Sequence, residues 1–157
     1  MSRLHGRGPR GTRVFDYIPH GRWETTTVIA GVGRKGPQAP WVLEGPMDGE
    51  AFSVWVEKVL VPTLEPTDIV VMDNLSVHQN AAAHAAIEAT GASIWPLPPY
   101  SHDLNPIEKM WSKVKAYLRK AKARTTESLY EAIGRAMEQV TQQDIQNWFA
   151  SCGYSLF

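Results

Sequence analysis

Apolar residues follow two patterns along the chain, short continuous runs and stripes at helical spacing. β-Branched and apolar residues at 25–32 (TTTVIAGV) predict a strand, and residues 33–40 read as a turn before a short second strand at 41–43. The continuous run 69–72 (IVVM) is typical of a strand buried on both faces, as in a parallel sheet. A further strand is expected at 93–95, where prolines end it.

The other apolar positions recur at helical spacing, three or four residues apart. Thr141 and Asp144 have the spacing of a capping box at the start of the last helical segment. The order is strands first, then strand and helix alternating, then helices, which indicates an α/β or mixed α+β protein. The expected helices are one capped by Asp48 with apolar positions 52, 55, 56, 59 and 60, an alanine-rich helix near 79–90, a helix at 106–122, and two more around 129–140 and 145–149.

The composition is that of one ordinary domain. The chain has 157 residues and is 43% hydrophobic, which is enough for a core and excludes a disordered protein. No apolar run is long enough to span a membrane, and the N-terminus lacks the charged and apolar segments of a signal peptide. The single cysteine, Cys152, excludes an internal disulfide and a cysteine-based metal site. We therefore expect a soluble, cytoplasmic domain.

The charges are balanced in number but separated along the chain. Sixteen basic and sixteen acidic residues give a formal net charge of zero, which by itself argues against a nucleic-acid partner. Residues 36–108, however, hold ten acidic residues and one basic residue, whereas 109–124 hold seven basic residues and no acidic one. Residues 1–35 hold seven basic and two acidic residues. Such blocks suit a metal ion beside a polyanion, but on charge alone a solvated surface of scattered charges is favoured.

Asp73 directly follows the apolar run 69–72. Sites in open α/β sheets form at the carboxyl ends of the strands, so an acidic residue there is well placed to hold a metal ion. Asp73 and Asn74 are equally typical of a turn or of a helix cap. For Asp73 considered alone, we favour the interpretation as a turn or helix-cap residue.

Glu108 stands three residues after Asn105, a spacing that predicts a capping box with Pro106 at the first helical position. On a helix, Lys115 and Arg119 fall on the same side as Glu108. A carboxylate beside two cations at a helix N-terminus suits a metal ion and the phosphate that the metal polarises. Surface contacts of little energetic weight are the alternative.

His78 and His102 flank the two acids, and neither has a histidine or cysteine partner at metal-ligand spacing. The sequence around His84 indicates no functional role for this residue. The sequence contains no nucleophile elbow of the Gly-x-Ser-x-Gly type, no phosphate-binding loop and no dinucleotide fingerprint. A hydrolase of small phosphate esters consequently has little support.

Two longer motifs surround the acids, 71–78 (VMDNLSVH) and 97–108 (LPPYSHDLNPIE), followed by Trp111 and Lys115. Thirty-four residues separate Asp73 from Glu108. In motifs and spacing the chain resembles the DDE-type transposases of the mariner-like superfamily, in particular their bacterial insertion-sequence branch. The stretches GRGPRG and TTTVIAGV are similar to that family as well, so the resemblance covers essentially the whole chain. His102 stands where the family usually has proline, a change expected to alter loop stiffness.

The resemblance implies an RNase H-like fold, a mixed sheet flanked by helices. It also implies two Mg²⁺ (or Mn²⁺) ions held by three carboxylates, which activate a water or a DNA 3′-hydroxyl for in-line attack on a phosphodiester. By motif match Asp73 is the second carboxylate and Glu108 the third, with Asn74, His78 and Asn105 in supporting positions.

The motif match assigns no residue of this chain to the first of the three carboxylates. In the family it lies on the first strand, upstream of the arginine- and glycine-rich stretch, and residues 1–5 include no acid. Asp16 lies downstream of that stretch. We therefore expect an N-terminally truncated chain that lacks its first strand, which leaves the strand at 69–72 with an unpaired edge. Residues 12–18 are a candidate to pair there instead.

The expected organisation is a partial catalytic domain at 1–124, with C-terminal helices at 125–157 packing on it. The expected function is that of a transposase catalytic fragment, inactive alone, that associates with the nucleoid. Its partners would be the transposon ends and target DNA, and an upstream-encoded transposase portion or a second copy. The open alternative is a non-catalytic fragment that binds DNA or regulates a transposase. The residues expected to contact DNA are Lys109, Lys113, Lys115, Arg119, Lys122, Arg7 and Arg10.

Overall fold

The structure is a computed structural model of the chain, and it describes residues 6–15 and 25–155. Strands and helices are mixed, so the expected α/β class is confirmed. No helix in the described ranges is long and apolar enough to cross a membrane. The strands are β1 (Thr26–Gly33), β2 (Gly36–Glu44), β3 (Ile69–Met72) and β4 (Ser93–Pro96). The helices are α1 (Gly49–Trp55), extended by a π-helical turn at Val56–Leu60, then α2 (Ala81–Glu88), α3 (Pro106–Ala121), α4 (Thr126–Glu138) and α5 (Gln142–Ser151).

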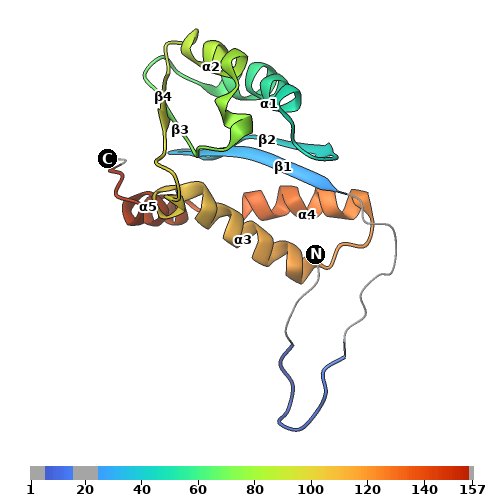
Figure 1. The fold of residues 1–157 in the computed structure, drawn as a ribbon. Coiled ribbons are helices and arrows are strands. Elements are labelled where there is room, and N and C mark those ends of the chain that lie inside the picture. The colour runs from blue at the N-terminus through green and yellow to red at the C-terminus, as the bar shows by residue number, and fades with distance from the viewer. Residues whose placement is uncertain (1–5, 16–24, 156–157) are drawn as a thin grey trace.

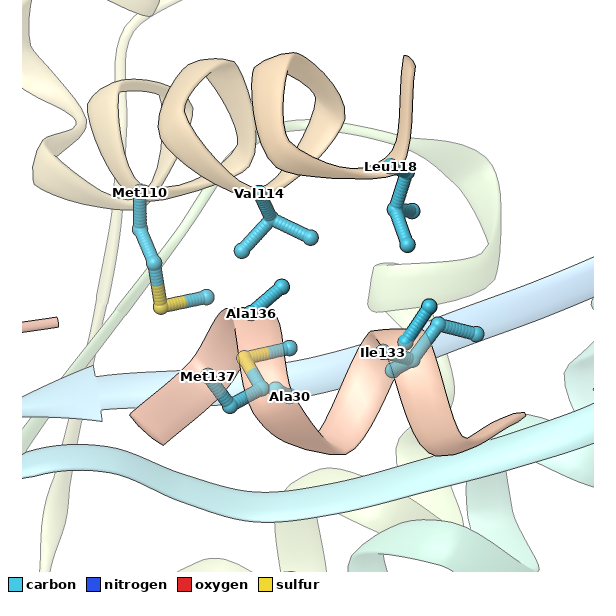
Figure 2. Close-up of a cluster of buried hydrophobic side chains, with 8 residues drawn as sticks. Ala30, Met110, Val114, Leu118, Ile133, Ala136 and Met137 are labelled. Atoms are coloured by element: carbon cyan, nitrogen blue, oxygen red, sulfur yellow. The ribbon is translucent and has the colours of Figure 1, made fainter. Parts of the chain in front are cut away.

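Helices lie on both sides of the β1–β2 hairpin (Figure 1), with α1 and α2 on one side and α3 and α4 on the other. The side under α3 is held by a cluster in which Met110, Val114 and Leu118 project from successive turns of α3. They meet Ala30 of β1 and the buried face of α4, including Ile133 (Figure 2). Because these residues of α3 recur every four positions, the helix buries one stripe and leaves the others in solvent.

A second cluster lies on the opposite side of the hairpin, under α1 and α2. Phe52 and Trp55 of α1 and Ile87 of α2 are buried in it. The indole Nε1 of Trp55 donates a hydrogen bond of 2.8 Å to the carbonyl oxygen of Ala39 in β2. Partly buried residues of all four strands pack against this cluster, namely Ile29, Trp41, Val70, Met72 and Ile94. Both pairs of strands therefore rest on the same helical layer.

The second strand is longer than the sequence predicts. β2 includes Pro37 and Pro40, which the sequence assigns to a turn. These prolines are tolerated because β2 pairs only with β1 among the described strands, so that one edge needs no backbone donors. The register between the strands also shifts near Gly31, and Ala39 adopts a left-handed φ of 50°.

The prediction that the strand at 69–72 is buried on both faces is wrong. Ile69 is 49% exposed, and Trp95, the register partner of Val71, is 57% exposed. The cause is that β3 has one neighbour in the described ranges, the parallel strand β4, so the four strands form two separate ladders. Of the suggested replacement partner 12–18, the described residues 12–15 form no strand. Asp16 and residues 17 and 18 lie outside the described residues.

Candidate active site

Asp73 directly follows the carboxyl end of β3, which lies beside the carboxyl end of β4. The two strand ends are joined by a hydrogen bond of 2.8 Å from the Leu97 N–H to the carbonyl oxygen of Met72. The carboxylate of Asp73 is 21% exposed, and its Oδ1 lies 2.6 Å from Nδ1 of His78. The Leu75 N–H approaches the same oxygen at 3.4 Å. Asp73 is thus a partly buried carboxylate whose engaged oxygen faces His78.

The helix-cap interpretation of Asp73 is not confirmed. Asn80 caps α2, because its Oδ1 accepts the N–H of Ala83 at 3.0 Å. Its Nδ2 donates to the carbonyl oxygen of Gly49 at 2.8 Å and so ties α2 to α1. Asn74 is exposed, and its Oδ1 accepts a hydrogen bond of 2.6 Å from Nε2 of Gln79. Asn80 thus caps α2 and Asn74 braces the turn between β3 and α2, while Asp73 takes part in that turn through the 3.4 Å contact with the Leu75 N–H.

Glu108 lies on the exposed side of the first turn of α3. The buried Asn105 caps this helix, with Oδ1 accepting the Ile107 N–H at 3.4 Å. The expected capping box does not form, because the Asn105 N–H donates instead to the carbonyl of His102 at 3.1 Å. The carboxylate of Glu108 has no hydrogen bond or ion pair with any described residue, and its charge is favoured by the helix N-terminus. By contrast, the predicted capping box of Thr141 and Asp144 is confirmed.

The expected DNA-contacting residues divide into different environments. Lys115 of α3 is exposed, whereas Lys109 and Arg119 are half-buried. Lys113 is hydrogen-bonded to Asp144 of α5, and this bond, helped by the Thr141 backbone, lowers the pKa of Asp144 from 3.8 to about 2. Lys113 thus joins two helices.

The remaining cations of this set lie at the end of α3 and near the N-terminus. Lys122 ends α3 in the left-handed conformation, with a φ of 51°. Arg7 and Arg10 are exposed on the segment 6–15, which extends away from the rest of the molecule (Figure 1). Both arginine side chains are therefore accessible to a macromolecular ligand.

No group of three histidine, cysteine or acidic side chains at metal-binding distance occurs in the ranges that the structure describes. The structure does bring His78 to Asp73, and it adds two contacts that the sequence pattern missed. The ring of Phe52 in α1 lies 5.0 Å from the His78 ring, and Nε2 of His84 lies 2.6 Å from the His78 carbonyl oxygen. No sequence motif indicates the second contact, which forms only where α2 packs against the turn after β3.

Comparison with known proteins agrees with these features. The family model for the DDE superfamily endonuclease matches residues 1–130. The chain belongs to this family of endonucleases. No curated protein matches the chain.

The solved structures that resemble the chain are transposase complexes. The crystal structure of the Mos1 strand transfer complex has 15% sequence identity and a TM-score of 0.70, and the match covers 100% of this chain and 51% of that one. A pre-cleavage Mos1 transpososome has 14% identity and a TM-score of 0.49, with 100% and 53% of the two chains covered. The chain thus spans about half the length of the solved structures it matches. The first of these likenesses confirms the expected RNase H-like fold.

Proposed function

We propose that the chain is part of the catalytic domain of a DNA transposase, which cleaves phosphodiester bonds and transfers strands with the help of divalent metal ions. The proposal rests on the place of Asp73, at the carboxyl end of β3, with one carboxylate oxygen engaged and the other open. The loop that leads to Glu108 starts from the same edge, because β4 runs parallel to β3. Membership of the DDE endonuclease family supports this chemistry.

Endonucleases of this superfamily generally depend on divalent metal ions. Asp73 and Glu108 fit such an ion, since Mg²⁺ and Mn²⁺ prefer carboxylate oxygens and usually take only one or two from a protein beside substrate phosphates. Two bound ions would supply an activated oxygen nucleophile and stabilisation of the leaving oxygen. The chain's own part is to hold the two carboxylates, and to place Lys115 and Arg119 of α3 where a phosphate can be contacted.

A third carboxylate, and with it full activity, would come from outside the described residues. β1 and β3 each pair with a single described strand, so each keeps an edge to which another strand can add. We attribute that strand and its acid to an upstream-encoded transposase portion, with a second copy of the chain as the other source. The chain alone would then be inactive.

DNA is the proposed partner. The Mos1 complex with the higher TM-score is named a strand transfer complex, and this chain carries exposed cations on the segment 6–15 and on α3. Arg7 and Arg10, with Lys109, Lys115, Arg119 and Lys122, are the proposed phosphate contacts. The division into a catalytic part at 1–124 and supporting helices at 125–157 is supported by α4, which packs on α3. A place on the nucleoid would follow from this DNA binding.

The test is cleavage of DNA that contains the element's terminal repeats, in Mg²⁺ or Mn²⁺, with and without the polypeptide encoded directly upstream. We expect cleavage only with both polypeptides, and its loss in Asp73→Asn and in Glu108→Gln. Asp103→Asn is the matched control, because Asp103 is an exposed acid five residues before Glu108. Cleavage that persists in both carboxylate variants would refute the proposal.

A non-catalytic, DNA-binding regulator remains the second candidate, favoured by the exposed arginines of 6–15. It predicts DNA binding that weakens steeply with salt and is unchanged by loss of both carboxylates. The same variants decide between the two, since only the catalytic proposal needs Asp73 and Glu108 for any property of the complex.

A further inference from the structure

The imidazole of His78 is the one side chain that fixes the orientation of Asp73 within the described ranges. Its Nδ1 lies 2.6 Å from Oδ1 of Asp73 and 3.3 Å from the backbone carbonyl oxygen of the same residue. Both neighbours are acceptors, so Nδ1 must hold a hydrogen atom and donate it. His78 and Asp73 are 22% and 21% exposed, and water competes little for this bond.

His78 is itself held from two further sides. Its ring packs on the buried ring of Phe52, with centroids 5.0 Å apart and planes inclined by 41°. Nε2 of His84 lies 2.6 Å from the His78 carbonyl oxygen, which can only accept, so His84 donates. The His78 N–H donates to the Leu75 carbonyl at 2.9 Å. The ring and backbone of His78 are thus fixed by α1, by α2 and by the turn between β3 and α2.

We infer that His78 is a positioning residue for Asp73: it holds Oδ1 and so keeps Oδ2 available to a divalent metal ion. Oδ2 accepts no hydrogen bond from any described residue, whereas Oδ1 receives both His78 and the more distant Leu75 N–H. This inference rests on the proposed function, because it takes Asp73 to be a metal ligand. A hydrogen bond to one oxygen fixes the carboxylate plane and leaves the other oxygen available to a metal ion.

The hydrogen bond from His78 to Asp73 can be tested with substitutions that keep or remove a donor at the position of Nδ1. Asparagine places its Nδ2 donor near the position of the imidazole Nδ1, whereas glutamine places a donor near Nε2. His78→Asn therefore keeps the bond to Asp73, and His78→Gln and His78→Ala lose it. A residue that served packing alone would not separate the two amides in this order.

The first measurement is Mn²⁺ binding by the whole chain, followed by electron paramagnetic resonance of free Mn²⁺. We expect Asp73→Asn to abolish binding, His78→Ala and His78→Gln to weaken it roughly 10- to 100-fold, and His78→Asn to restore it to within about threefold. His102→Ala is the matched control, since His102 is an exposed histidine near Glu108. Circular dichroism and thermal unfolding identify any variant that fails to fold.

The second measurement needs no metal. Long-range ¹H–¹⁵N correlation spectra of the histidine rings at alkaline pH should show His78 protonated on Nδ1, with a downfield Nδ1–H signal that moves in Asp73→Asn. The Nε2–H tautomer at His78 would overturn the inference. The inference would also be overturned if His78→Ala bound Mn²⁺ as tightly as the unsubstituted chain does, while Asp73→Asn lost Mn²⁺ binding. If instead Asp73→Asn leaves Mn²⁺ binding unchanged, or the unsubstituted chain binds none, the proposed function fails first.

Discussion

The two acids of the candidate site are presented in opposite ways. Asp73 is partly buried, and its carboxylate is fixed by His78 at 2.6 Å, with Phe52 behind the histidine. Glu108 is exposed, and no described side chain contacts its carboxylate. Its position depends on where α3 begins and on what anchors that helix.

The difference shows that the two halves of the site have separate structural supports. The Asp73 half depends on the cluster under α1 and α2, to which Phe52 belongs. The Glu108 half depends on the cluster between α3 and α4, on the Asn105 cap and on the Lys113–Asp144 pair. Substitutions in one support should therefore leave the other acid in place.

The two cores give the largest expected separation. Phe52→Ala and Met110→Ala each remove a fully buried side chain, and should destabilise the fold by about 3–5 and 2–5 kcal/mol respectively in urea unfolding. Because Phe52 packs on His78, its loss should also shift the Nδ1–H signal of His78 in the folded protein. Met110→Ala should leave that signal unchanged. Equal shifts in both variants, measured where both are fully folded, would break the division.

The ion pair between α3 and α5 adds an acid-sensitive support to the Glu108 half. Lys113 lowers the pKa of Asp144 to about 2, below the ordinary value of 3.8. The unfolded chain therefore binds this proton first, so the stabilisation is present above about pH 4 and is lost as the pH falls through 2. Since the Lys113 and Asp144 side chains are 35% and 25% exposed, solvent screening limits the effect to about 1 kcal/mol.

Asp144→Asn isolates this charge effect, because asparagine also caps helices and keeps the Thr141 end of α5. Unfolding in urea at pH 7 should show the loss of about 1 kcal/mol, and at pH 2 the variant and the unsubstituted chain should converge. A constant difference at both pH values would mean that Asp144 acts through packing and not through its charge.

The cap of α3 is the support nearest to Glu108. Asn105→Ala should cost about 1 kcal/mol, the usual value for a lost N-cap. Fraying should stay in the first turn, so amide exchange should rise at Ile107 and Glu108 and remain slow at Val114. Asn105→Ser is the control that preserves a cap acceptor. Unchanged exchange in Asn105→Ala would show that the Pro106 ring and the packing of Met110 suffice to start the helix.

The division of the site also marks what the sequence can predict. The positions of α3 and of Asp73 after β3 follow from local patterns, an apolar stripe in one and a continuous apolar run in the other. The motif match then predicts that the two acids act together. The structure confirms the positions of β3 and α3, because each depends on residues close in sequence, whereas the joint action of the two acids stays a prediction.

The incorrect predictions have non-local causes. Burial of β3 depends on a neighbouring strand, and the apolar run 69–72 does not reveal that only β4 pairs with it. The capping box at Glu108 fails because the Asn105 N–H finds the carbonyl of His102, in a turn that spacing does not predict. His84 has no motif of its own, and its role appears only where α2 folds back onto the turn after β3.

The smallest expected effect concerns two lysines of α3 that the sequence treats alike. Lys115 is exposed and available to phosphate, whereas Lys113 is bound to Asp144. If Lys115 contacts one phosphate, Lys115→Ala should reduce the slope of log K against log salt by about 0.9 for duplex DNA. Lys113→Ala should leave that slope unchanged and lower stability instead, by about 1 kcal/mol.

The pair is informative because the two residues lie on one helix, two positions apart, with the same charge. Fluorescence anisotropy of a labelled duplex across a salt series gives both slopes, and urea unfolding gives both stabilities. The reverse result, a reduced slope for Lys113→Ala with full stability, would mean that DNA displaces Asp144 from Lys113. The Glu108 half of the site would then be rearranged on binding DNA, while the Asp73 half, whose supports lie on α1 and α2, would stay as it is.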